Sequence, residues 1–200
     1  KAPPRMKAKI FGLILLGAGI LLVSTTVGSR ILELKQREAL IAQTRRTQGI
    51  HEEAQTTEFM DDDARFSFAD GPALLRIPSL DLEEAVCEGT AAQTLRISLG
   101  HMENTGEPGG PGNCVIAGHR NVVGGFFHDL PSIAIGAEII LQQGSSSVVY
   151  EVYQTLTVTP QDNSVLLSDG TGQLTLITCS SAIEPTHRFV VQARLKTTDS

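Results

Sequence analysis

The stretch VVYEVYQTLTVT, residues 148–159, decides the fold class of this chain. Its large apolar side chains share one parity: Val148, Tyr150, Val152, Leu156 and Val158. Polar side chains occupy most of the positions between them. Because successive side chains of a strand point to opposite faces, the alternation predicts a single strand with one buried face.

Similar strand patterns follow and precede this stretch. Residues 189–195 repeat the alternation, and residues 137–141 and 173–179 are short apolar runs bounded by turn residues. Gly- and Pro-rich turns separate these runs. Short, β-branched strands with frequent turns indicate an all-β barrel or sandwich. We expect this domain to occupy residues 72–197.

The N-terminal part differs in composition from the rest. Residues 1–9 carry four basic side chains, and residues 10–27 are uncharged and mostly apolar. As a helix rising about 1.5 Å per residue, residues 10–27 are just long enough to cross a membrane. The basic residues predict a cytoplasmic N-terminus, a single-pass transmembrane anchor and an extracytoplasmic domain. A cleaved signal peptide is the alternative, and it would export the domain as well.

Residues 28–71 would connect this anchor to the domain. Residues 29–48 contain good helix formers and neither Gly nor Pro, which predicts a helical stalk. Residues 52–71 carry an acidic run and no clear period, which is typical of a flexible linker.

Composition excludes several functions. The chain has 200 residues, of which 41% are hydrophobic, so the domain can fold around a core. Its formal net charge of −6 and the absence of a basic stripe argue against nucleic-acid binding. Three cysteines, Cys87, Cys114 and Cys179, stand outside any spacing typical of zinc sites. We expect neither a metal nor a cofactor.

Three residues at strand ends could carry chemistry. Cys179 ends the run LTLITC, His119 follows the apolar run 114–118, and Arg188 opens the next strand. A thiolate can attack a carbonyl, an imidazole can move protons, and a guanidinium can stabilise an oxyanion. From spacing alone, a packed thiol, a structural His and a surface Arg are the more common alternatives, and they remain open.

The local runs resemble the sortase family, in particular class D members and those of marine proteobacteria. The family pattern TLxTC stands at residues 175–179, and GNCVIAGHR at residues 112–120 resembles the strand that ends in Gly-His. Arg188 in HRFVVQARL stands at the family's arginine position. Residues 75–90 and 100–113 resemble the family's first strands and a Gly-rich loop. The resemblance covers residues 75–195.

This resemblance implies an eight-stranded β-barrel with short helices, preceded by a transmembrane helix and stalk. It implies a membrane-anchored cysteine transpeptidase that cleaves an LPxTG-like C-terminal sorting signal of a protein substrate. Cys179 would form a thioester, with His119 and Arg188 as its catalytic partners. An amine on the cell envelope or on another protein would then accept the substrate.

Further residues are secondary candidates. Thr178, Ser180 and His101 are candidates for substrate contact, although for His101 we favour a hydrogen bond that orders its loop. Ser180 and its neighbour replace the aromatic–Pro pair usual in class D, so the signal preference is open. Cys114 has the opposite strand parity to His119 and is expected to be a core thiol.

Two other functions remain alternatives. An exported cysteine endopeptidase that uses water would have the same residues. A non-catalytic, anchored β-barrel binding module would not need Cys179 as a nucleophile.

Overall fold

The structure, a computed structural model, describes residues 4–47, 65–120, 125–179 and 186–196. The side chains of residues 4–20 and of Cys179 are outside this description. The chain divides into two compact units, Lys1–Gln36 and Arg37–Ser200. The second unit carries the barrel and the candidate site.

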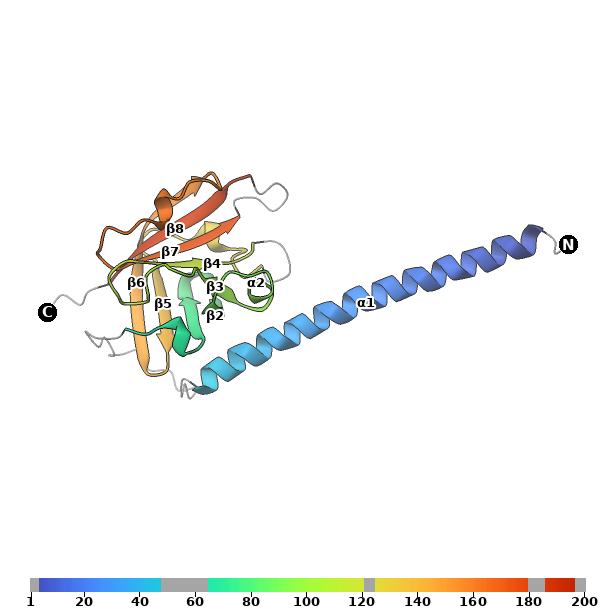
Figure 1. The fold of residues 1–200 in the computed structure, drawn as a ribbon, viewed down its shortest axis with the longest axis horizontal. Coiled ribbons are helices and arrows are strands. Elements are labelled where there is room, and N and C mark those ends of the chain that lie inside the picture. The colour runs from blue at the N-terminus through green and yellow to red at the C-terminus, as the bar shows by residue number, and fades with distance from the viewer. Residues whose placement is uncertain (1–3, 48–64, 121–124, 180–185, 197–200) are drawn as a thin grey trace. The chain divides into compact units, whose positions relative to one another are not determined.

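The N-terminal unit is helical. Helix α1 spans Pro4–Thr47, so it begins before the predicted stalk and ends where the stalk was expected to end (Figure 1). Arg45 and Arg46 lie in its last turn, where positive charge complements the helix dipole. Where side chains are described, no helix is both long and apolar enough to cross a membrane. The predicted anchor at residues 10–27 falls mostly outside those side chains and stays a prediction.

In the described part of the chain, eight strands form a closed barrel in the order β1-β2-β3-β4-β7-β8-β6-β5. The strands are β1 (Ala73–Ile77), β2 (Leu82–Glu88), β3 (Leu99–His101), β4 (Asn113–Ala117), β5 (Glu138–Gln143), β6 (Ser146–Val158), β7 (Gln173–Cys179) and β8 (Arg188–Leu195). A short helix, η1 (Phe68–Asp70), precedes β1, and four more lie between strands: η2 (Pro78–Leu80), α2 (Thr94–Ile97), η3 (Leu130–Ser132) and η4 (Ser164–Leu166). The prediction of an eight-stranded β-barrel with short helices is confirmed.

Alternation along the strands builds the core. On β4 and β7 the interior positions are Cys114, Ile116, Leu174 and Leu176, all of which are fully buried in one hydrophobic cluster. The intervening positions of both strands form the outer face of the barrel wall. β4 and β7 are parallel neighbours, and β8 joins β7 from the other side. The ends of β4 and β7 and the start of β8 therefore meet at one rim.

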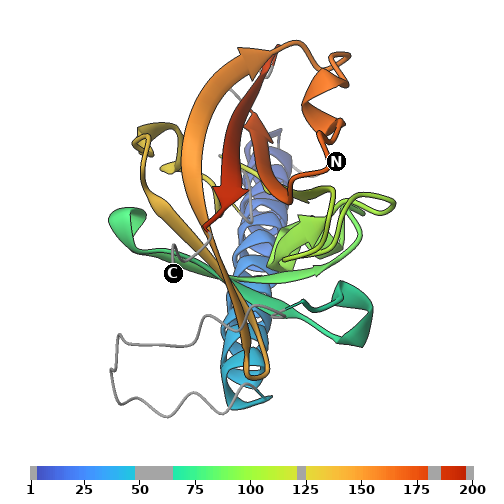
Figure 2. The ribbon, with the colours of Figure 1, turned by 90° about the vertical axis from the view of Figure 1, so that its left-hand side faces the viewer.

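Strand β6 departs from the sequence prediction. It is long and lies against β8, orange beside red in Figure 2. Its register against β8 shifts between Val152 and Gln154. Such a bulge adds one residue, so the side chains that follow it change faces. The prediction that one face of β6 collects all its apolar side chains was therefore wrong beyond Val152.

The bulge has a consequence for the outer face. Before it, Val152 pairs with Ala193, a residue of the core cluster. After it, Leu156 pairs with Val190 and Val158 pairs with Arg188. Val158 thus shares the outer face with Arg188 and contributes to the pocket described below.

Candidate active site

The rim of the barrel brings His119 level with Cys179. β4 and β7 run parallel, and Ala117 pairs with Ile177. The pairing continues beyond the strand, because the Gly118 N–H donates to the carbonyl oxygen of Ile177 at 3.1 Å. Two residues past the Ala117–Ile177 pair, both chains reach the positions of His119 and Cys179. Neighbouring strands lie only about 4.8 Å apart, so the two backbones are close.

Arg188 reaches the same rim from the other side. β8 is antiparallel to β7, and its first residue, Arg188, pairs with Cys179. Residues directly opposite in such a pair have Cβ atoms about 4.5–5.5 Å apart and point to the same face. The sheet register thus places the backbones of His119, Cys179 and Arg188 on three adjacent segments of the chain, at the ends of β4 and β7 and at the start of β8.

Close packing fixes the chain that carries His119. A Cβ added to Gly118 would lie 2.5 Å from Leu99 Cδ2 and 2.7 Å from Phe127 Cδ2, so any side chain there would force these two neighbours to shift. The Phe127 N–H donates to the carbonyl oxygen of His119 at 3.0 Å. Thr178, on β7, donates its hydroxyl to the carbonyl oxygen of Gly118 at 2.9 Å. These contacts hold the backbone on both sides of the imidazole.

Burial affects the protonation of two groups. His119 is half-buried, and burial lowers the pKa of its imidazole below the ordinary value of 6.5. The imidazole is therefore mostly neutral at neutral pH. Cys114 lies fully buried on the interior face, where burial and then the charges of Glu107 and Glu88 raise the pKa of its thiol. The expectation that Cys114 is a core thiol is confirmed.

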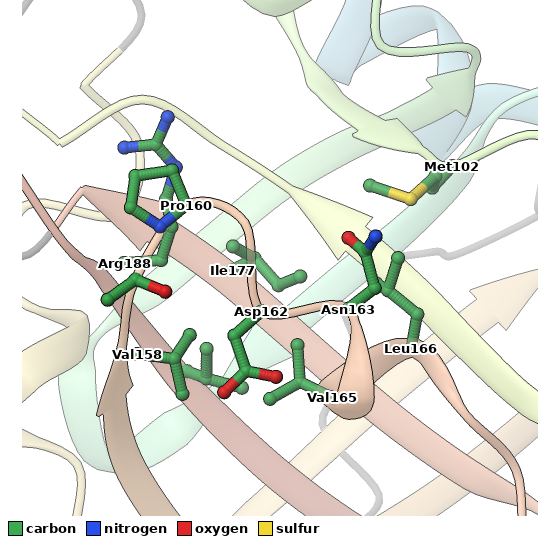
Figure 3. A pocket seen from close by; sticks show the side chains of 11 residues that line it. Met102, Val158, Pro160, Asp162, Asn163, Val165, Leu166, Ile177 and Arg188 are labelled. Atoms are coloured by element: carbon green, nitrogen blue, oxygen red, sulfur yellow. The ribbon is translucent and has the colours of Figure 1, made fainter.

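A pocket lies on the outer face of the barrel wall beside this rim. Strand residues Val158, Ile177, Arg188 and Val190 line it, and the segment between β6 and β7 closes it. That segment and the loop after β3 contribute Thr159, Pro160, Asp162, Asn163, Val165, Leu166 and Met102. Figure 3 shows Arg188 beside Pro160 at one end, Ile177 in the middle, and Met102 with Leu166 at the other end.

Most of the pocket's lining side chains are apolar, and Arg188 and Asp162 are its two charged ones. Its aliphatic side chains are those of Val158, Val165, Leu166, Ile177 and Val190. Ile177 precedes Cys179 by two residues and shares its strand parity. Such a pocket suits an extended peptide that places an apolar side chain among the aliphatic residues and a carbonyl near Arg188.

Of the three predicted substrate-contact residues, the structure describes Thr178 and His101, and both are buried. Thr178 is buried, and its hydroxyl is used by Gly118, so it positions the rim. Ser180 lies outside the described residues. His101, at the end of β3, pairs with the interior residue Ile116 and is stacked on Phe68 with ring centroids 4.5 Å apart.

The surroundings of His101 favour the loop-ordering alternative. Its exposed fraction is 2%. Its Nδ1 lies 2.7 Å from Glu88 Oε2, and its Nε2 lies 3.1 Å from the carbonyl oxygen of Gly106. These contacts tie the end of β3 to the Gly-rich loop. The structure does not bring His101 to the outer face that carries the pocket.

Sequence reasoning missed the pocket wall. Val165 and Leu166 stand in the segment between two strands, and their approach to Ile177 depends on the fold of that segment. Asn113, which binds this segment, is separated from it by more than fifty residues. No spacing signal in the sequence connects them. Among the described residues, no group of three or more His, Cys, Asp or Glu side chains is placed to hold a metal ion.

Solved structures share this architecture. A Clostridium perfringens Sortase D5 transpeptidase superposes with a TM-score of 0.66 at 24% identity, over 82% of this chain and 99% of that one, which supports the fold. Sortase E from Streptomyces avermitilis superposes with a TM-score of 0.57 at 34% identity, over 62% of this chain and 87% of that one.

Sequence relatives give the same result. Sortase A of Bacillus anthracis is 30% identical over 122 residues, 60% of this chain and 58% of its own length. Sortase D of Bacillus subtilis (strain 168) is 30% identical over 107 residues, 53% of this chain and 52% of its own length. The chain thus spans little more than half of these relatives. The model of the Sortase domain family matches residues 75–196, and the chain therefore belongs to the sortase family.

Proposed function

We propose that this protein is a cysteine transpeptidase that cleaves an LPxTG-like sorting signal and transfers the substrate protein to an amine. Membership of the sortase family supports an enzyme of this class. The observation that carries the proposal is the register at the rim, where Cys179 pairs with Arg188 and stands level with His119.

The first half of the reaction would form a thioester. The Cys179 thiol gives its proton to neutral His119, and the resulting thiolate attacks the carbonyl carbon of the Thr–Gly bond in the signal. Arg188 donates hydrogen bonds to the oxygen, which becomes negative in the tetrahedral intermediate. The imidazolium of His119 gives its proton to the departing Gly nitrogen as the C–N bond breaks. The Thr carbonyl remains bound to Cys179 as a thioester.

The second half reverses the proton movement. An acceptor amine attacks the thioester carbonyl, and neutral His119 takes its proton. The C–S bond breaks, the Cys179 thiolate returns, and a new amide joins the substrate to the acceptor. The lowered pKa of His119 suits this step, because the imidazole is then mostly ready to accept a proton. Burial of the rim by substrate would also hinder attack by water.

The pocket suggests how the signal binds. Leu is the only large apolar residue that an LPxTG-like motif specifies, and the aliphatic part of the pocket offers a place for its side chain. The Pro that follows it favours an extended backbone, which fits a groove beside a strand. We therefore propose that the signal lies along the outer face from this pocket to Cys179.

The setting of the reaction is part of the proposal. Residues 1–9 would stay in the cytoplasm, residues 10–27 would anchor the chain, and the catalytic domain would lie outside the membrane. The acceptor would be an amine on the cell envelope or on another protein. The basic residues before an uncharged apolar run support this orientation.

Peptide cleavage tests the proposed function. The protein is incubated with an LPxTG-like peptide, and mass spectrometry follows the thioester on Cys179 and the released Gly-containing fragment. Triglycine is then added as the amine. A ligated product that Cys179→Ala does not form would support the transpeptidase. Cleavage that ignores triglycine would indicate an endopeptidase, and no cleavage by the wild-type protein would contradict both.

A further inference from the structure

A polar cluster is buried on the outer face of the barrel, beneath the segment that joins β6 to β7. Asn113, the first residue of β4, and Thr175, in the middle of β7, have exposed fractions of 2% and 0%. Both have the strand parity of the outer face, so they lie outside the core cluster. Buried polar groups are costly unless hydrogen-bonded, so their partners indicate what they hold in place.

The partners come from a different part of the chain. Asn113 Nδ2 donates to the carbonyl oxygen of Val165 at 3.0 Å and to that of Leu167 at 3.3 Å. Its Oδ1 accepts a hydrogen bond from Thr175 Oγ1 at 2.8 Å. Two carbonyl oxygens can only accept, so the orientation of the amide is determined by its partners. One side chain thus joins β4 and β7 to both ends of a short turn.

That turn is one wall of the pocket. Val165 and Leu166 line the pocket, and the two carbonyl groups bound by Asn113 flank Leu166 in the chain. The opposite side is formed by the strand residues Ile177 and Val190. The hydrogen bonds of Asn113 therefore set the distance between the two walls of the pocket, the loop that contains Leu166 and the sheet that contains Ile177.

We call Asn113, Thr175 and their hydrogen bonds to each other and to the turn the clamp. Strand β7 carries one residue of the clamp, one residue of the pocket and the proposed nucleophile. Thr175, Ile177 and Cys179 follow one another at every second position of β7. A strand rises about 3.3 Å per residue, so Thr175 lies about 13 Å from Cys179 along it. A shift of the wall relative to Thr175 is therefore also a shift relative to the nucleophile.

We infer that Asn113 and Thr175 are positioning residues, and that their hydrogen bonds set the width of the pocket that selects the apolar side chain of the signal. The inference rests on the proposed function for the identity of the ligand, an apolar side chain of an extended peptide. The clamp itself rests on the hydrogen bonds alone. The inference therefore has two parts, that the clamp orders the turn and that it sets substrate specificity, and they are tested separately.

Two variants disrupt these hydrogen bonds with little change in side-chain shape. Thr175→Val removes the hydroxyl that donates a hydrogen bond to Asn113 Oδ1. Asn113→Asp removes the N–H donors to the carbonyl groups of Val165 and Leu167. Thr175→Ser keeps the hydroxyl and is the matched control. Because both changes disrupt one network, the double variant should be hardly worse than the more damaging single variant.

Hydrogen exchange tests the clamp without any substrate. In Thr175→Val and Asn113→Asp, we expect amide exchange in residues 163–168 to accelerate, while exchange in β1 and β5 stays as in the wild type. Thr175→Ser should behave as the wild type. Unchanged exchange at residues 163–168 in both disrupting variants would overturn the inference. Faster exchange throughout the barrel would also overturn it, because it would indicate a general structural role.

Peptide kinetics test the effect on specificity. A misplacement of about 1 Å can cost about 10²-fold, so we expect kcat/KM for an LPxTG-like peptide to fall about 10- to 100-fold, mainly through KM. The preference for Leu over Ala at the first signal position should also weaken. If exchange at residues 163–168 is faster but KM and the preference for Leu over Ala are unchanged, the clamp does not set substrate specificity, and that part of the inference is overturned. A wild-type protein that cleaves no signal would instead contradict the proposed function, and the exchange result would still decide the clamp.

Discussion

Cys179, the last residue of β7, lies directly opposite Arg188, the first residue of β8. The two residues belong to one antiparallel pair, so the sheet register fixes the spacing between their backbones. Residues 180–187 connect them, yet the spacing does not depend on how that connection is arranged. The arginine is therefore placed by the sheet register, and it also lines the pocket.

Replacement of Arg188 should lower turnover without unfolding the protein. Arg188→Lys keeps the positive charge but loses the planar fork of donors. We expect kcat to fall about 10²- to 10³-fold, as is typical when a donor to an oxyanion is removed. Arg194→Ala on the same strand is the matched control, because Arg194 is exposed and stacks on Tyr153 away from the rim. Full activity of Arg188→Lys would show that charge alone is required.

A side chain at Gly118 should destabilise the barrel. In Gly118→Ala, the new Cβ would lie within 3 Å of Leu99 and Phe127, and Phe127 also binds the carbonyl group of His119. Overpacking of this kind typically costs about 1–3 kcal/mol, which thermal or denaturant unfolding would measure. Displacement of His119 should lower kcat/KM as well.

The control for this change is Gly28→Ala in α1, where an added Cβ meets nothing within 4 Å. It should leave both stability of the barrel and activity unchanged. A Gly118→Ala variant as stable and active as the wild type would contradict the close packing of the rim.

The sequence predicted the strands better than the pocket. A short apolar run and its flanking turn residues predicted β7 with its observed bounds, Gln173–Cys179, because an apolar strand between a Gly and a polar loop needs only local information. The same reasoning predicted β5 at residues 137–141, close to the observed Glu138–Gln143. The bulge in β6 was not predictable, because it is defined by the partner strand β8.

The candidate site shows the same division. Cys179, His119 and Arg188 were each visible as the residue at a strand end, and the family pattern connected them. Asn113 gave no sign of its role, since its partners lie more than fifty residues away. His101 was assigned two possible roles, and only its buried contacts with Glu88 and Gly106 favour one of them.

The imidazole of His119 should titrate below its ordinary value. Burial disfavours the charged form and lowers the pKa from 6.5. NMR titration of the Cys179→Ala variant, in which no thiolate can interact with the ring, should give a midpoint below 6.5. His119→Gln identifies the signal by its loss. A midpoint at or above 6.5 would contradict the effect of burial.

The same shift predicts the direction of a change in stability. The unfolded chain, with the ordinary pKa, takes up a proton at higher pH than the folded protein does. As pH falls through 6.5, the unfolded state therefore binds more protons, and the free energy of unfolding decreases. In His119→Gln this contribution to the pH dependence should disappear. Its persistence in that variant would assign it to another group.

His101 should matter for stability more than for catalysis. Its ring nitrogens contact three oxygen atoms: Glu88 Oε2 lies 2.7 Å from Nδ1, and the Gly106 carbonyl oxygen and Thr105 Oγ1 each lie 3.1 Å from Nε2. These contacts hold the ring between the end of β2 and the Gly-rich loop. In His101→Asn, the shorter side chain loses the contacts with Glu88 and Gly106 and the stacking on Phe68. Each lost hydrogen bond typically costs about 0.5–1.5 kcal/mol.

Denaturant unfolding and peptide kinetics separate the two roles of His101. The loop-ordering role predicts a lower free energy of unfolding with KM for the peptide little changed, because His101 faces the interior. A substrate contact predicts the reverse, a raised KM with unchanged stability. Glu88→Gln is the matched test, since it keeps the size of the side chain but removes its charge. It should destabilise the wild-type protein, yet have little effect when added to His101→Asn, because both changes disrupt the same pair.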